Sequence, residues 1–183
     1  SVLDALLKKV STLFIGGGMA FTFLKALGYD IGDSIVDDSL LAKAKSLIDT
    51  CEKRLIPLFL PQDVVIAKDL ENLDTFKIID IKQGIPNNMM GVDIGPKTVA
   101  KWTEILGKAA TIFWNGPLGI FEVAGASKGT IDIALCLANS KAKTLIGGGD
   151  SSAAINTAGI NTKKFDHISI EHHAKCNMRC TYC

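Results

Sequence analysis

Hydrophobic residues along this chain fall into short apolar runs that alternate with segments of helical periodicity. The runs are brief and lead into glycine, which is typical of a buried strand followed by a tight turn; they are TLFIGG (12–17), TIFWNGPLG (111–119) and KTLIGGG (143–149). Apolar residues recur every three or four positions in the intervening segments, which predicts helices at 2–9, 19–27, 37–55, 97–109, 127–139 and 151–159.

The repeated order of strand, glycine turn and helix indicates the fold class. Parallel strands need crossover connections, and these are usually helices. The sequence therefore predicts an α/β fold: a three-layer, Rossmann-like parallel β-sheet with helices on both faces. Apolar runs at 56–61, 64–68 and 76–81 and the segment FDHISI (165–170) are further strand candidates. In the helix at 37–55, Cys51 and Leu55 fall on the face expected to pack inward.

Composition and charge narrow the possible partners. Hydrophobic residues make up 48% of the 183 residues and the formal net charge is +1, so no charge excess favours nucleic acid. No apolar run approaches the roughly 18 residues that span a bilayer, and no secretory signal pattern opens the chain. From these features we expect a monomeric protein in the cytoplasm that binds neither nucleic acid nor membrane.

Four glycine-bearing turns, at 16–18, 91–95, 115–119 and 147–149, follow predicted strands, which is the position where ligands bind in such sheets. The turn in LIGGGDSSAAI (145–155) allows close backbone approach next to a helix N-terminus. Its side chains include Ser151 and Ser152 as hydroxyl donors and Asp150 as a ligand for magnesium. The local pattern equally allows Asp150 or Ser151 to act only as a helix cap. Neither standard dinucleotide nor Walker glycine motif is present.

Two other turns differ in chemistry. IGGGMAF (15–21) has no polar side chain, so it suits either a flat apolar ligand or simple packing of a helix on a strand. WNGPLGIFE (114–122) carries Asn115 as an amide donor and Glu122, which could accept from a ribose hydroxyl.

Taken in order, the motifs IGGGMAFTFLKALGYDIGDSIV, MGVDIGPKT, FWNGPLGIFE, SKGT, IGGGDSSAA and FDHIS closely resemble the C-terminal, nucleotide-binding half of phosphoglycerate kinase. The resemblance runs from about residue 2 to about residue 169. It implies a parallel-sheet domain that binds MgADP or MgATP, and a separate half that binds 3-phosphoglycerate. It also implies phosphoryl transfer between 1,3-bisphosphoglycerate and ADP in glycolysis, by positioning and charge neutralisation rather than covalent chemistry.

The resemblance assigns roles to individual residues. Gly16, Gly17 and Gly91 would form the wall around adenine and ribose, with Val92 packing nearby. Glu122 would bind the ribose hydroxyls and Asn115 would lie beside the phosphates. The phosphate chain and its magnesium would be received by Gly148, Gly149, Asp150 and Ser151.

The chain departs from the family pattern at both ends. It starts after the position of the substrate-binding half and of one lysine-bearing strand. After FDHIS the family continues with a glycine loop, but this chain reads IEHHAKCNMRCTYC (170–183). We therefore expect two parts, the kinase-like domain at 1–169 and an unrelated tail at 170–183, and no catalysis by this chain alone. A non-catalytic nucleotide-binding protein is the alternative interpretation.

The tail has chemistry of its own. Cys176, Cys180 and Cys183 have the spacing C-x3-C-x2-C, which looks like the iron–sulfur motif of radical S-adenosylmethionine enzymes. With His172 and His173 these cysteines could instead hold zinc. A join or truncation with no function in the tail is the third interpretation.

Overall fold

The computed structural model describes residues 7–161 and 164–168 of the chain. The predicted helix at 2–9 lies mostly outside these residues, and Leu7–Lys9 form a turn. Strands and helices follow each other in the order β1 (Leu13–Phe14), α2 (Gly17–Ala26), α3 (Leu41–Lys53), β2 (Leu58–Phe59), β3 (Asp63–Ala67), β4 (Lys77–Asp80), β5 (Met90–Ile94), α4 (Pro96–Leu106), β6 (Thr111–Asn115), α5 (Lys128–Asn139), β7 (Lys143–Gly147), α6 (Gly149–Thr157) and β8 (Asp166–Ile168). Short 3-10 turns lie at Asp38–Leu40, Leu73–Thr75, Ile81–Gln83 and Ala124–Ala126.

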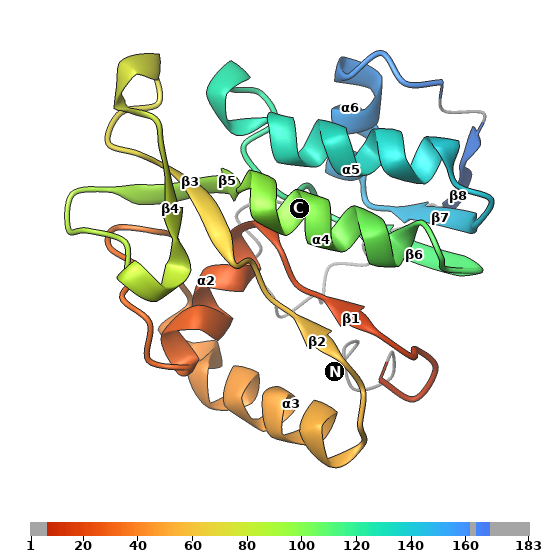
Figure 1. Ribbon diagram of the computed structural model, residues 1–183, viewed down its shortest axis with the longest axis horizontal. Helices are drawn as coiled ribbons and strands as arrows, with labels where there is room; N and C mark the ends of the chain where they lie inside the picture. Colours follow the sequence, from red (N-terminus) through yellow and green to blue (C-terminus); the bar gives the residue numbers. More distant parts are fainter. Residues whose placement is uncertain (1–6, 162–163, 169–183) are drawn as a thin grey trace.

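The predicted three-layer α/β architecture is confirmed. Adjacent residues of a strand point to opposite faces, and in β1 these faces are covered by different helices (Figure 1). Leu13 packs into the cluster formed with α2 and α3, whereas Phe14 packs into the cluster that includes Trp102 of α4. The Phe14 ring stacks on Phe59 of β2 at 5.0 Å and meets the Trp102 ring edge-on at 5.2 Å. The strands thus form a middle layer between two groups of helices.

Parallel pairing is found where helices connect the strands. β6, β7 and β8 form a parallel sheet in that order, with Trp114 opposite Ile146, and β1 pairs with β2 in parallel. The helices α4, α5 and α6 supply buried residues to the cluster over β6 and β7, where Trp102 and Trp114 lie as expected for core tryptophans. Figure 1 shows α4 and α5 lying side by side across these strands.

The middle strands depart from the parallel pattern. β3 pairs antiparallel with both β4 and β5. Along the chain, β4 and two short 3-10 turns lie between β3 and β5, and no α-helix does. The connection from β3 to β4, residues 68–76, is too short for a parallel crossover, which needs a dozen or more residues, so these two strands pair antiparallel. The parallel sheet predicted from the overall alternation therefore does not extend to this segment.

The helix predicted at 37–55 ends earlier than its apolar pattern suggested. Cys51 is buried in the α3 contact surface, as predicted, and is 1% exposed. The prediction for Leu55 was wrong, because this side chain is 88% exposed. The Ile56 N–H bonds to the Cys51 carbonyl, and Leu55 adopts a left-handed backbone with φ of 55°. This turn at the end of α3 directs Leu55 away from the core.

Candidate nucleotide-binding site

The turn after β1 lies against the turn after β6. A Cβ atom added to Gly16 would lie 2.5 Å from Leu118 Cδ2, and one added to Gly17 would lie 2.6 Å from the Pro117 carbonyl oxygen. Gly17 also has a φ of +61°, in the region that favours glycine. The glycines at 16 and 17 are therefore required by close packing of two turns at the carboxyl ends of their strands.

The turn after β7 reaches the same place from the other side. A Cβ on Gly148 would lie 3.0 Å from Asn115 Oδ1, so the amide of Asn115 borders this turn. The Gly116 N–H donates to Ser151 Oγ at 2.7 Å. Ser151 is fully buried, so its hydroxyl oxygen ties α6 to the turn after β6. Three of the four glycine turns thus meet at one edge of the molecule, as their positions after parallel strands predict.

The N-terminus of α6 bears on one of the two interpretations of this turn, the helix cap. The N-cap residue is Gly148, and no side chain caps the helix by a hydrogen bond. Outside its chain neighbours and the backbone of its own helix, no heavy atom of the described residues lies within 4 Å of a Cβ added to Gly149, which is exposed. Asp150 is half-buried in the first turn. An uncapped helix start with open space above it is suited to a phosphate group, and the neighbouring carboxylate is suited to its magnesium ion.

The prediction of a fourth glycine turn at 91–95 was wrong, because residues 91–94 lie within strand β5 and pair with β3. A Cβ on Gly91 would collide with the ring of Phe21, and the Gly91 N–H donates to Ser34 Oγ at 2.8 Å. Val92 is 3% exposed and packs in a cluster with Ala67 and Ala126. Both residues predicted for the adenine wall therefore also have internal packing roles. The Val92 carbonyl accepts from the Ile120 N–H at 2.9 Å, which joins β5 to the segment after β6.

Glu122 stands on that segment, two residues beyond Ile120, and its side chain is exposed. The Val123 N–H donates to the Ile120 carbonyl at 3.0 Å, which closes a turn around Glu122. The carboxylate predicted for ribose binding is therefore on an anchored backbone and open to solvent.

Two buried polar residues near this site were missed by sequence reasoning. Asp93 is 2% exposed, and its burial raises the pKa of its carboxyl group to about 7. Thr130 is 1% exposed, and its hydroxyl accepts from the Leu118 and Gly119 N–H groups at 3.0 Å each. An aspartate inside the apolar strand MGVDI was the available signal, because a carboxylate is rarely buried there without partners.

Other predicted chemistry is absent from the described residues or lies beyond them. Within residues 7–161 and 164–168, no group of three or more His, Cys, Asp or Glu side chains is arranged to hold a metal ion. The cluster of Cys176, Cys180 and Cys183 lies outside the described residues, so an iron–sulfur or zinc site there stays a prediction. In the same described ranges, no helix has the length and apolar content needed to cross a membrane.

The fold and the edge where the turns meet define an α/β domain of the kind in which ligands bind at the carboxyl ends of the strands. The chain belongs to the phosphoglycerate kinase family, whose model matches residues 1–178. Members of this family are glycolytic kinases, a class of transferases that uses magnesium nucleotides.

Individual relatives give the same result. The phosphoglycerate kinase of Clostridium perfringens is 44% identical over 169 residues, and that of Aquifex aeolicus is 46% identical over 168. Both alignments cover 92% of this chain but 42% of the relative. The solved phosphoglycerate kinase of Coxiella burnetii superposes with a TM-score of 0.86 at 37% identity, over 92% of this chain and 43% of that one. The chain thus spans less than half the length of the relatives it matches.

Proposed function

We propose that this chain forms the MgADP- and MgATP-binding part of a phosphoglycerate kinase. The observation that carries the proposal is the uncapped N-terminus of α6, which adjoins Asn115 and opens beside Asp150. In this arrangement the N–H groups at the start of α6 bind phosphate oxygens, and the Asp150 carboxylate is available to magnesium. Gly16 and Gly17 border the site on the side assigned to the base, and Glu122 accepts from the ribose.

We further infer that nucleotide binding and phosphoryl transfer are separable in a chain of this extent. Transfer requires a second substrate held in line with the nucleotide. The described residues include the edge that we propose binds the nucleotide. The alignment leaves more than half of each relative unmatched. The phosphoglycerate-binding half would be the partner that completes the reaction.

Calorimetric titration of the purified chain with MgADP tests the first proposal. We expect saturable binding that weakens at least fivefold in Asp150→Ala and in Glu122→Ala. Asp49→Ala is the matched control, because Asp49 is an exposed carboxylate on α3, the helix that packs on the other group of strands. Absence of binding at millimolar MgADP, or equal affinity in all four proteins, would contradict the proposed site.

A coupled assay with MgATP and 3-phosphoglycerate tests the inference that nucleotide binding and phosphoryl transfer are separable. We expect no turnover above background from a chain that nevertheless binds MgADP. Turnover by this chain alone would show that the remaining part of the relatives is not needed for transfer.

A further inference from the structure

Asp93 is placed where β5 meets the start of α5. Its Oδ1 accepts from the Ile94 N–H at 2.9 Å, and its Oδ2 accepts from the Gly129 N–H at 2.6 Å. Gly129 lies in the first turn of α5, so the carboxylate holds the N-terminus of that helix. A hydrogen bond this short to a buried carboxylate is among the stronger ones in proteins.

The next residue of α5 continues the connection. Thr130 Oγ1 accepts from both the Leu118 and the Gly119 N–H groups. Packing is equally close, because a Cβ added to Gly119 or to Gly129 would collide with or press against the Asp93 carboxylate. One continuous set of contacts therefore leads from β5 through the start of α5 to residues 118 and 119.

We propose that Asp93 and Thr130 are positioning residues for the nucleotide: through the first turn of α5 they hold residues 116–122 in the geometry that binds the ligand. This segment packs against Gly16 and Gly17 at its Pro117–Leu118 end, and it carries Glu122 at the other. Neither Asp93 nor Thr130 needs to touch the nucleotide. The proposal rests on the proposed function and names residues that set the shape of that site.

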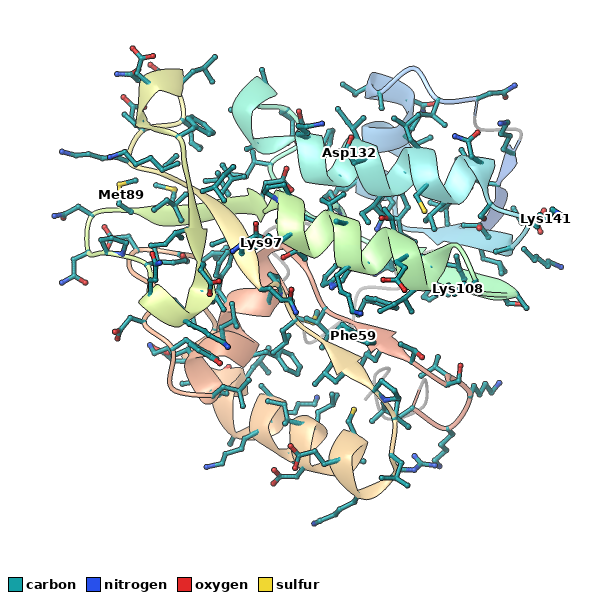
Figure 2. All side chains as sticks on the ribbon, viewed as in Figure 1. Phe59, Met89, Lys97, Lys108, Asp132 and Lys141 are labelled. Atoms are coloured by element: carbon teal, nitrogen blue, oxygen red, sulfur yellow. The ribbon has the colours of Figure 1, made fainter. Side chains whose placement is uncertain are left out.

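Burial favours a titration of Asp93 near neutral pH. Burial raises the pKa of Asp93 most, the N–H groups of Gly129 and Ile94 lower it, nearby Asp132 raises it, and Lys128 lowers it. Lys128 and Asp132 pair with each other at 2.9 Å on the exposed side of α5, where Figure 2 labels Asp132. On β3, Asp63 is turned to α4 and accepts from the Lys97 and Thr98 N–H groups. Above pH 7 the ionised Asp93 therefore accepts from Gly129 most strongly, and below pH 7 protonation weakens that bond.

Calorimetry with MgADP and two variants of Thr130 tests the geometric part. Thr130→Val keeps the shape but leaves two backbone N–H groups without their acceptor, so we expect the Kd to rise about five- to tenfold. Thr130→Ser retains the hydroxyl and should bind within about twofold of wild type. A valine variant that binds as tightly as wild type overturns the proposal.

The pH profile tests the role of Asp93 with a measurement that a merely structural residue would not change. From pH 6 to pH 8 we expect the MgADP affinity of the wild type to rise more than that of Asp93→Asn; taking the ratio of the two proteins cancels the titration of the nucleotide. Parallel profiles would overturn the proposal. If wild type itself does not bind MgADP, the proposed function fails instead, and the two failures are distinguishable.

Hydrogen exchange keeps the proposal falsifiable if the variants do not fold. In the wild type, protection of the Leu118 and Gly119 amides, corrected for intrinsic exchange, should change between pH 8 and pH 6. It should also rise when MgADP binds. Protection that is indifferent to both pH and nucleotide would overturn the proposal.

Discussion

The two triple-glycine turns have nearly the same sequence context and different surroundings. In the turn at 16–18, Gly16 and Gly17 are pressed against Leu118 and Pro117. In the turn at 147–149, Gly148 is also crowded, by Asn115, but Gly149 is exposed and a Cβ added there would meet no described atom outside its own helix and chain neighbours; α6 starts without a side-chain cap. Glycine is thus required by packing at 16, 17 and 148, whereas at 149 it is not.

The comparison also shows what connects the turns. Residues 116–119 contact the first turn through Pro117 and Leu118, and bond to Ser151 beyond the second through Gly116. Thr130 accepts from the Leu118 and Gly119 N–H groups of this shared segment, and Asp93 accepts from the Gly129 N–H beside Thr130. Changes to residues 116–119 (the shared segment), to the turn at 16–18 and to the turn at 147–149 should therefore have separable effects on stability and on nucleotide affinity.

The largest effect on the free energy of unfolding is expected for Asp93, which lies next to the shared segment. The pKa of Asp93 is raised from 3.8 to about 7 in the folded protein, so between these pH values the folded state binds more protons than the unfolded state. The contribution of Asp93 to the free energy of unfolding therefore falls as pH rises through this window, by on the order of 4 kcal/mol. Urea unfolding from pH 4 to pH 8 should show a flatter decline in Asp93→Asn. Asp33→Asn, at an exposed aspartate, is the control and should follow the wild type.

A change in the turn at 16–18 should cause the next largest loss in the free energy of unfolding. Gly17→Ala places a Cβ atom 2.6 Å from the Pro117 carbonyl oxygen on a residue with φ of +61°. Because a backbone atom cannot move aside cheaply, we expect a loss of about 3 kcal/mol in the free energy of unfolding. Thermal or urea unfolding measures it. A loss below about 1 kcal/mol would mean that the two turns do not depend on each other's packing.

Removing the hydrogen bond between Gly116 and Ser151 should lower the free energy of unfolding by a smaller amount. Ser151→Ala leaves the half-buried Gly116 N–H without its acceptor, which we expect to lower the free energy of unfolding by about 1–3 kcal/mol. Ser152→Ala is the matched control, because its hydroxyl makes only a long contact of 3.4 Å with the Gly148 carbonyl. Equal losses from the two changes would argue against a special role for Ser151.

A change at Gly149, in the turn at 147–149, should alter the free energy of unfolding least. Gly149→Ala introduces a methyl group into open space at the first position of α6, where alanine favours the helix. We expect the free energy of unfolding to stay unchanged or to rise by up to about 1 kcal/mol. MgADP affinity should nevertheless fall, because the methyl group occupies the space through which a phosphate approaches. Unchanged affinity in a stable variant would remove Gly149 from the site.

Much of the architecture could be predicted because it follows from local periodicity. The apolar runs that end in glycine became β1, β6 and β7, and the helical patterns became α2 to α6 with Cys51 and the tryptophans in the core. The antiparallel pairing of β3 with β4 and β5 was not predicted from the overall alternation of strands and helices. Pairing direction depends on which strands become neighbours and on whether a helix connects them. The outward turn of Leu55 was missed for a similar reason: an apolar pattern does not mark where a helix ends.

The sequence by itself determined that glycine turns follow the strands at 16–18, 115–119 and 147–149, and its ordered motifs placed the chain in its family. It left the helix cap and the phosphate site equally open at Asp150, because both use the same residue types next to a helix start. The tertiary structure shows that neither the Asp150 nor the Ser151 side chain caps α6, because Gly148 stands at the N-cap and Ser151 is buried against Gly116. It also shows the hydrogen-bond partners of Asp93 and Thr130, since the partners of a buried polar group come from segments that are distant in the chain and meet only when it folds.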